Sequence, residues 1–168
     1  MSEIQLPHQY TPRDYQLPVW EAYRNGCKRF VAVWHRRAGK DKTFLNLLIH
    51  AMTQRVGTYY YFVPTYNQGK KIIWDGIDGE GFRFMAHFPG FSAPGTGLVK
   101  SKDETEMQVE LVNGSIFQVV GTDKMERVVG TNPVGCLFSE YSLQKKAAWD
   151  FASPILLENG GWAAFVYT

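Results

Sequence analysis

The stretch HRRAGKD, residues 35–41, follows the apolar run FVAVW at 30–34 and precedes the helical pattern TFLNLLI at 43–49. A strand, a tight turn with Gly-Lys and a helix are the arrangement of a phosphate-binding loop. In such a loop the backbone N–H groups and the helix N-terminus face the anion, and the lysine reaches the β- and γ-phosphates. The sequence therefore predicts that Gly39 and Lys40 bind a nucleoside triphosphate. The neighbouring residues expected to line it are His35, Arg37, Ala38, Lys42 and Thr43.

The loop departs from the usual pattern at two positions. Trp34 replaces the glycine expected six residues before the lysine, and Asp41 replaces the hydroxyl residue expected after it. A carboxylate at position 41 can bind Mg²⁺, a hard cation that prefers oxygen ligands. Alternatively, Asp41 only caps the helix, as Asp often does near a helix N-terminus. A basic surface turn is the alternative interpretation of the whole loop.

Length and composition describe one globular domain. The chain has 168 residues, of which 45% are hydrophobic and 20% charged. Its net charge of +2 gives no overall basic field, so any nucleic-acid contact needs a local patch. No run of 18 apolar residues occurs, so we expect no membrane span and no membrane partner. Cys27 and Cys136 lack metal-ligand spacing, and Cys136 is expected to be a buried reduced thiol.

Short apolar strands alternate with helical patterns along the chain, which predicts an α/β fold with a mainly parallel sheet and helices on both faces. A hairpin is expected around Asn113-Gly114, where alternating apolar residues meet a strong turn signal. Residues 79–97 are rich in Pro and Gly and are expected to form a surface loop. The other expected strands cover 30–34, 58–63, 135–138 and the segment after 160–161, and the expected helices cover 11–24, 43–52, 67–77 and 144–157.

A triphosphate hydrolase also needs carboxylates to hold Mg²⁺ and to activate water. In open α/β sheets such groups lie at the carboxyl ends of strands. Glu140 directly follows the strand predicted at 135–138, and we assign it as the catalytic base. Ser139 stands where an Asp is usual, so Asp41 and Ser139 together look like an exchange of the usual hydroxyl and Asp at the metal. The alternative for Glu140 is a strand-end surface carboxylate.

Four further residues are candidates for the site. Arg36, inside the loop, could stabilise charge on the γ-phosphate, which makes it a candidate catalytic residue. Arg127 could serve a neighbouring subunit's site, or it could be an ordinary salt-bridged arginine. Tyr15 and Gln16 could hold adenine, because a glutamine amide can pair with the base and an aromatic ring can stack on it.

The order of these motifs resembles the N-terminal ATPase domain of a tailed-phage large terminase, the DNA-packaging motor. The resembling segments are 15–16, 35–41, 63–68, 138–142 and 159–168. The resemblance spans nearly the whole chain, and Ser139-Glu140 resembles a terminase branch in which Ser-Glu replaces Asp-Glu.

The resemblance implies a P-loop NTPase fold of the ASCE/RecA-like type that uses ATP and Mg²⁺. It implies that Lys40 contacts phosphate, that Glu140 activates water and that Thr168 carries the coupling hydroxyl that senses the γ-phosphate. Residues 1–168 are expected to form a single ATPase domain, truncated in or just after the coupling-motif strand. The C-terminal nuclease of the family is absent, so no nuclease activity is expected. The acidic residues Asp75, Asp78 and Glu80 are interpreted as a solvated helix end.

The resemblance also implies partners: double-stranded DNA, a portal protein, a small terminase subunit and further copies in a ring, in the host cytoplasm at the procapsid portal. The candidate DNA contacts are Lys70, Lys71, Lys100 and Lys102, with scattered surface lysines as the alternative. Two other functions stay open. One is a helicase-like nucleic-acid translocase, although Tyr141-Ser142 does not fit its motif. The other is a nucleotide- or DNA-binding module without turnover.

Overall fold

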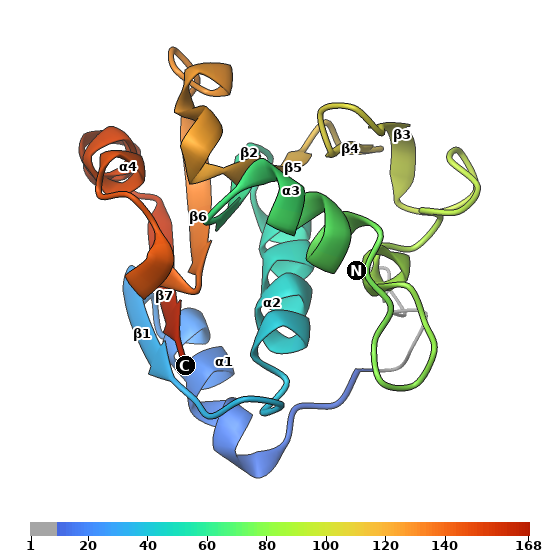
Figure 1. Cartoon of the computed structure of the whole chain (residues 1–168), viewed down its shortest axis with the longest axis horizontal. Coiled ribbons are helices and arrows are strands. Elements are labelled where there is room, and N and C mark those ends of the chain that lie inside the picture. Colours follow the sequence, from blue (N-terminus) through green and yellow to red (C-terminus); the bar gives the residue numbers. More distant parts are fainter. Residues whose placement is uncertain (1–9) are drawn as a thin grey trace.

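The computed structural model describes residues 10–168, which build a seven-stranded sheet with helices packed on it (Figure 1). The strands are β1 (Arg29–Val33), β2 (Thr58–Val63), β3 (Val99–Asp103), β4 (Gln108–Leu111), β5 (Ile116–Gly121), β6 (Pro133–Ser139) and β7 (Trp162–Tyr167). The α-helices are α1 (Leu17–Arg24), α2 (Lys40–Gln54), α3 (Tyr66–Gln68) and α4 (Ala147–Asn159). The other helical segments are η1 (Asp14–Gln16), η2 (Gly69–Trp74), η3 (Phe84–His87), η4 (Thr122–Arg127) and η5 (Tyr141–Leu143).

The strand order is β1-β7-β6-β2-β5-β4-β3. The first five strands in this order pair in parallel, and β4 and β3 add antiparallel pairs. The predicted parallel sheet is therefore confirmed, and so is the hairpin, in which β4 and β5 meet around Gly114 with φ of 95°. Strand β3 was not predicted, so the hairpin is part of a three-stranded meander. Its sequence VKSKD is mostly polar and exposed, and therefore carries no alternating apolar signal.

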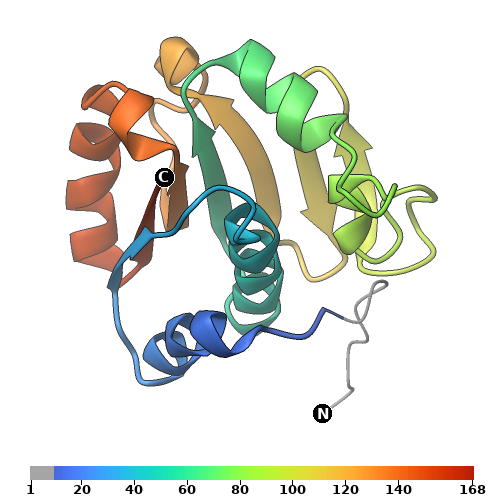
Figure 2. The ribbon, with the colours of Figure 1, turned by 60° about the horizontal axis from the view of Figure 1, so that its bottom comes forward.

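Two hydrophobic cores lie on opposite faces of the sheet. Helices α1 and α2 cover one face, and α4 covers the other (Figures 1 and 2). Strand β2 shows how the sequence divides between them, because successive side chains of a strand point to opposite faces. Tyr59 and Tyr61 belong to the core under α2, and Tyr60 and Phe62 belong to the core under α4.

Residues 79–97 contribute to the core, which corrects the prediction of a purely surface loop. Phe88 packs on Phe117 of β5, and Phe91 packs edge-on against Trp74. Pro and Gly signal turns here, but they do not show where the aromatic side chains between the turns point. The helix predicted at 67–77 is also shorter than expected. It consists of α3 followed by η2, which is wound as a π-helix and ends at Trp74.

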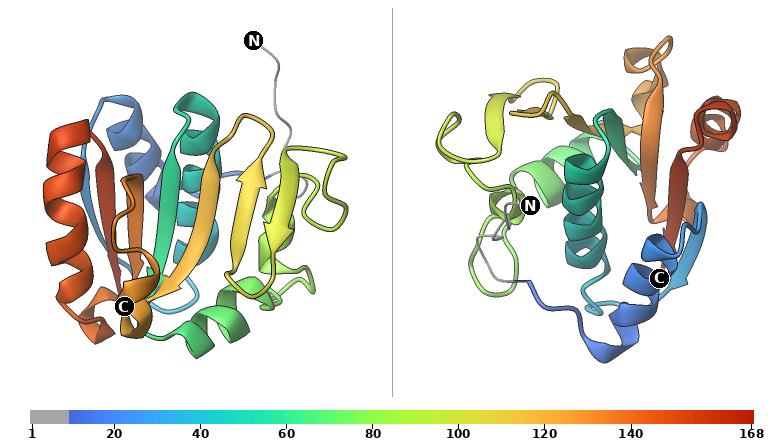
Figure 3. Two further views of the ribbon diagram at one scale, coloured as in Figure 1. Left: turned by 90° about the horizontal axis from the view of Figure 1, so that it is seen from above. Right: turned by 180° about the vertical axis from the view of Figure 1, so that it is seen from behind.

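The carboxyl ends of the parallel strands gather at one edge of the sheet, together with the start of α2 (Figure 3, left). This is the edge at which open α/β sheets bind ligands. Among residues 10–168, no helix is both long and apolar enough to span a membrane. Cys27 and Cys136 are free thiols, and Cys136 is buried as predicted.

Candidate functional site

The loop after β1 curls through two left-handed residues. Arg37 has φ of 64° and Gly39 has φ of 74°, and the 15-residue helix α2 begins at Lys40. A Cβ atom added to Gly39 would lie 3.1 Å from Gln16 Nε2, so this position favours glycine both for its conformation and for its close contact. The free N–H groups in the first turn of α2 give this end of the helix a partial positive charge. An anion is therefore favoured beside Gly39.

Two side chains from the N-terminal segment, those of Tyr15 and Gln16, hold the loop through hydrogen bonds. Gln16 Nε2 and the Tyr15 hydroxyl both donate to the carbonyl of Ala38, at 2.9 and 2.8 Å. Gln16 is only 3% exposed, and its amide oxygen accepts from the Arg13 N–H and the Tyr10 hydroxyl. The structure thus uses Gln16 to brace the loop. The adenine contact expected of Tyr15 and Gln16 stays a prediction.

Some of the remaining residues of the loop are exposed, and others are buried and hydrogen-bonded. His35, Arg36 and Arg37 are exposed, and His35 Nδ1 lies 2.7 Å from the Arg36 carbonyl. Thr43 is buried, where its hydroxyl donates to the Gly39 carbonyl at 2.9 Å and accepts from Tyr10. Lys42, Arg13, Gln16 and Gly39 help to line a polar hollow of about 230 Å³ beside the loop.

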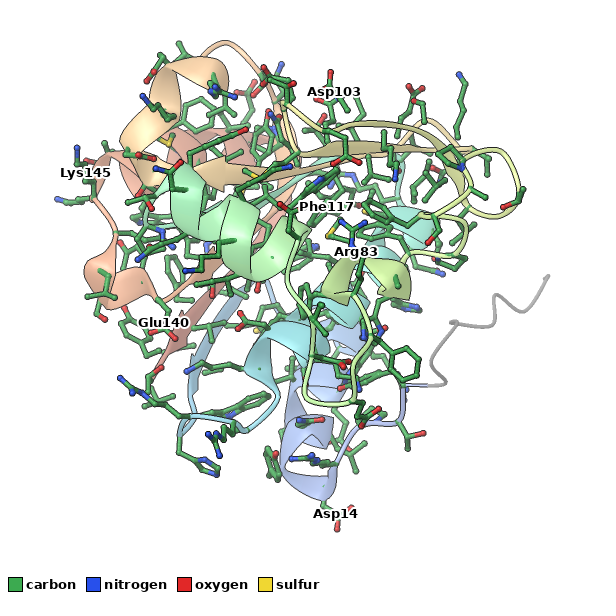
Figure 4. The ribbon with its side chains drawn as sticks, turned by 45° about the vertical axis from the view of Figure 1, so that its right-hand side comes forward. Asp14, Arg83, Asp103, Phe117, Glu140 and Lys145 are labelled. Atoms are coloured by element: carbon green, nitrogen blue, oxygen red, sulfur yellow. The ribbon has the colours of Figure 1, made fainter. Side chains whose placement is uncertain are left out.

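Lys40, Glu140 and Thr168 meet at the strand ends. Lys40 Nζ lies 3.1 Å from Glu140 Oε1, and the lysine side chain is 8% exposed against 35% for the glutamate. The Thr168 hydroxyl is 2.8 and 3.1 Å from the two carboxylate oxygens of Glu140, and Lys40 also donates to it. Figure 4 shows Glu140 on the side of the molecule where the loop after β1 lies, far from Asp103. Three residues that the sequence singled out separately therefore touch one another.

Glu140 has an unusual backbone conformation. It follows Ser139, the last residue of β6, and its φ of 52° is left-handed, which is uncommon for a residue other than glycine. Strained backbone of this kind persists where the surroundings fix it, and it clusters at functional sites. The conformation turns the chain sharply after β6, and the carboxylate then lies beside Lys40.

Asp41 lies next to Ser139, as the exchange hypothesis requires. The Ser139 hydroxyl donates to Asp41 Oδ1 at 2.9 Å. A second donor was not predicted: the Tyr61 hydroxyl, from β2, donates to the same oxygen at 2.5 Å. Burial and the Asp41 carboxylate raise the pKa of Tyr61 well above its usual value, so this hydroxyl stays protonated and donates. No sequence signal marks Tyr61, because it stands in the run TYYYFV that reads as buried strand.

The chemistry of these donors fits Mg²⁺. Asp41, Ser139 and Glu140 line a common cavity of about 160 Å³, which has room for an ion and a few waters. Mg²⁺ is usually held by one or two carboxylates, waters and substrate phosphates, rather than by an all-protein cage. Within the described part of the chain, no three His, Cys, Asp or Glu side chains are grouped to hold a metal by themselves. One carboxylate and one hydroxyl beside a phosphate loop meet the requirement.

Gln144 is a further residue that sequence analysis missed. Its Nε2 donates to the carbonyls of Phe62, at 2.9 Å, and Ser139, at 2.6 Å. It therefore ties the ends of β2 and β6 together next to the site. Nothing in its position near the start of a predicted helix indicates this role.

Arg127 and three of the four candidate DNA-contact lysines lie in ion pairs away from the loop. Arg127 Nη1 is 3.3 Å from Glu106 Oε2, and its guanidinium covers the Tyr66 ring, which matches the salt-bridged alternative. Among the candidate DNA contacts, Lys70, Lys100 and Lys102 each have a carboxylate partner, and Lys71 is exposed.

The acidic residues 75, 78 and 80 do not form a site. Asp75 pairs with Lys70 and Arg83, and the Asp78 carboxylate accepts from the backbone N–H groups of Glu80 and Phe82. This agrees with the interpretation of a solvated helix end.

Comparison with solved structures shows which fold this is. The chain superimposes on the large terminase ATPase domain of Thermus phage P74-26 with a TM-score of 0.70 and 17% identity, over 99% of this chain and 70% of that one. It also matches the large terminase of a second phage, a thermophilic bacteriophage, with a TM-score of 0.68 and 14% identity, over 94% of this chain and 39% of that one.

A structure of this second phage's large terminase in complex with ATP-γ-S matches with a TM-score of 0.65 and 14% identity, over 92% of this chain and 37% of that one. No family model matches the sequence, and no curated protein sequence matches it. At these identities the likeness establishes the fold, which is that of the phage large terminase ATPase domains.

Proposed function

We propose that this chain is the ATP-hydrolysing motor domain of a viral terminase large subunit, which drives double-stranded DNA into a procapsid. The observation that carries the proposal is the convergence of Lys40, Glu140 and Asp41 at the start of α2, on a fold shared with terminase ATPase domains. The large terminase of the thermophilic bacteriophage, which has this fold, is in complex with ATP-γ-S in one structure and with ADP in another, which supports nucleotide binding by this chain.

Phosphate binding falls to the loop and the helix start. The backbone after Gly39 and the first N–H groups of α2 face the β- and γ-phosphates, and Lys40 supplies a full positive charge. Arg36, exposed on the same loop, adds a second charge near the γ-phosphate. The hollow beside Gln16 and Lys42 would take the base and ribose.

Hydrolysis requires Glu140 to change partners. In the structure its carboxylate is held by Lys40 and Thr168, and phosphate draws Lys40 away. Glu140 then accepts a proton from the water whose oxygen attacks the γ-phosphorus, while the bond from that phosphorus to the β,γ-bridging oxygen breaks. Bound Mg²⁺ would neutralise charge on the phosphate oxygens, held by Asp41 with Ser139 beside it. Thr168, which touches Glu140 and Lys40, links the state of the γ-phosphate to the strand β7 that precedes it.

The test is steady-state Mg²⁺-dependent ATP hydrolysis by the wild-type chain and by Glu140→Gln, with and without double-stranded DNA. Glu158→Gln is the matched control, since Glu158 is an exposed carboxylate near the end of α4. We expect turnover that disappears only in Glu140→Gln. Equal turnover in all three proteins would refute the assignment of Glu140. Nucleotide binding without turnover would instead support a binding module.

The proposed partner is double-stranded DNA, contacted through backbone phosphates. Because Lys70, Lys100 and Lys102 already have acidic partners, DNA must compete with those ion pairs. Lys71 and Lys100 are the exposed lysines of the set. Binding of this kind weakens steeply as salt rises. A DNA affinity that does not change with salt would remove these lysines from the proposal.

The wider assembly follows from the terminase proposal. We propose self-association into a ring, with a portal protein and a small terminase subunit as partners, in the host cytoplasm at the procapsid. In a ring, Arg127 would have to leave Glu106 to reach a neighbour's site, and Arg127→Ala should then lower only the turnover of the assembled form. We propose no nuclease activity for residues 1–168, which a plasmid cleavage assay with Mg²⁺ or Mn²⁺ tests directly.

A further inference from the structure

Tyr61 differs from its neighbours in what its hydroxyl binds. It is fully buried in β2, and the hydroxyl donates to Asp41 Oδ1 at 2.5 Å. The hydroxyl of Tyr59, on the same face of β2, donates to the carbonyls of Ala51 and Arg55. The hydroxyl of Tyr60, on the opposite face, donates to Thr131. Of these three consecutive tyrosines, only Tyr61 reaches a charged group at the site.

We propose that Tyr61 is a positioning residue for the metal: its hydroxyl orients the Asp41 carboxylate so that one oxygen faces Mg²⁺ at the nucleotide phosphates. This inference rests on the proposed function and deepens it. The metal ligand is Asp41, and Tyr61 acts through it without touching the ion.

The geometry of Asp41 supports this role. The hydroxyls of Tyr61 and Ser139 both donate to Oδ1, from β2 and from the end of β6. Two donors on one oxygen fix the rotation of the carboxylate and leave Oδ2 outside both bonds. Outer-shell hydrogen bonds of this kind orient ligating carboxylates, and their loss lowers metal affinity by roughly 10- to 100-fold in known sites.

Packing alone does not call for a hydroxyl at position 61. Tyr61 lies in the central part of the sheet, opposite Leu137 of β6 and Val119 of β5, where an apolar ring would fill the same space. A buried hydroxyl has to be hydrogen-bonded, and here the bond goes to the residue that follows the phosphate-binding lysine. The purely structural alternative is that the bond only fastens the first turn of α2 to the sheet.

The experiment measures binding of a fluorescent, non-hydrolysable ATP analogue in EDTA and in Mg²⁺. The proteins compared are the wild type, Tyr61→Phe, Tyr59→Phe as the matched buried tyrosine, and Asp41→Asn. We expect Mg²⁺ to tighten binding to the wild type and to Tyr59→Phe equally. Tyr61→Phe should lose roughly tenfold of that gain while its affinity in EDTA is unchanged. Asp41→Asn should lose the gain altogether. If the bond between Tyr61 and Asp41 only fastened α2 to the sheet, Tyr61→Phe would lower the affinities in EDTA and in Mg²⁺ together, or would change neither.

If circular dichroism shows that Tyr61→Phe does not fold, Ser139→Ala, which removes the second donor to Oδ1, takes its place in the test. It should reduce the Mg²⁺ gain in the same direction. If Tyr61→Phe or Asp41→Asn keeps the full wild-type gain in affinity from Mg²⁺, the inference is overturned and the proposed function stands. The same holds for Ser139→Ala where that variant replaces Tyr61→Phe. A wild-type chain that binds no nucleotide in either buffer overturns the proposed function and the inference with it.

Discussion

Lys40 Nζ lies 3.1 Å from Glu140 Oε1, so the lysine predicted to hold phosphate is paired with the carboxylate predicted to activate water. The same two residues share the Thr168 hydroxyl. A nucleotide phosphate bound as proposed would therefore displace Glu140 from Lys40, and the two anions would compete for one cation.

This competition predicts that Glu140→Gln binds nucleotide more tightly than the wild type while losing hydrolysis. Removing the negative charge frees Lys40 for phosphate. Because Glu140 is partly exposed, the gain should be modest: roughly fivefold in affinity, or about 1 kcal/mol. Titration with a fluorescent ATP analogue measures it. An affinity equal to that of the wild type would mean that the ion pair does not oppose binding.

Gly39→Ala should lose nucleotide binding as well as stability. Its φ of 74° is left-handed, which costs a non-glycine residue about 1–2 kcal/mol, and the new Cβ would press on Gln16 Nε2. Gly160→Ala is the control, because Gly160 has φ of 71° at the end of α4 and open space around its Cβ position. Both variants should melt at lower temperature, and only Gly39→Ala should bind nucleotide more weakly. If the two bind equally well, the Gly39 conformation does not matter for the site.

Tyr15 and Gln16 should be energetically coupled, because both donate to the buried Ala38 carbonyl. In Tyr15→Phe or Gln16→Leu one donor remains, whereas the double variant leaves the carbonyl without either. The double variant should therefore lose about 1 kcal/mol more stability than the sum of the single variants. Urea denaturation of the four proteins measures the coupling. Tyr60→Phe with Gln16→Leu should be additive, since the Tyr60 hydroxyl binds Thr131 on the other face.

Acid should destabilise the meander through Glu104. The Trp74 indole N–H, and then Lys102, lower the pKa of this carboxyl below its unfolded value of 4.5. Since the folded pKa is the lower one, ionised Glu104 stabilises the fold above pH 4.5, and this contribution is lost as pH falls through the folded pKa. Thermal melts from neutral pH down to about pH 3 should show a shallower acid loss for Glu104→Gln than for the wild type. The effect should be small, because Glu104 is largely exposed. Identical acid profiles would contradict it.

The parts of the fold that the sequence predicted correctly are those where local pattern and tertiary environment agree. The continuous apolar run of β2 requires burial on both faces, and the Asn113-Gly114 turn fixes the β4–β5 hairpin. β3 is polar and lies at the sheet edge, so its partner β4, rather than its own residues, makes it a strand. The burial of Phe88 and Phe91 was not predicted, because turn residues surround them in the sequence and their burial depends on tertiary contacts.

At the site, residues that mark the ends of elements were predictable, and residues inside elements were not. Lys40 starts α2 and Glu140 follows β6, so sequence order alone puts both at the carboxyl edge of a parallel sheet. Tyr61 and Tyr59 look alike in the run TYYYFV, yet one hydroxyl meets a carboxylate and the other meets backbone carbonyls. Only the packing of α2 on β2 distinguishes them.

The contact between Ser139 and Asp41 also constrains how these two positions evolve. A lineage that places a hydroxyl residue at 41 leaves two hydroxyls facing each other, without the carboxylate proposed to hold the metal. A lineage that first places Asp at 139 brings two carboxylates within hydrogen-bonding distance, where like charges repel. Each single step is unfavourable, whereas the double exchange restores one carboxylate and one hydroxyl. In an alignment of descendants of this chain, the two positions should therefore change as a pair, although they stand 98 positions apart in the sequence.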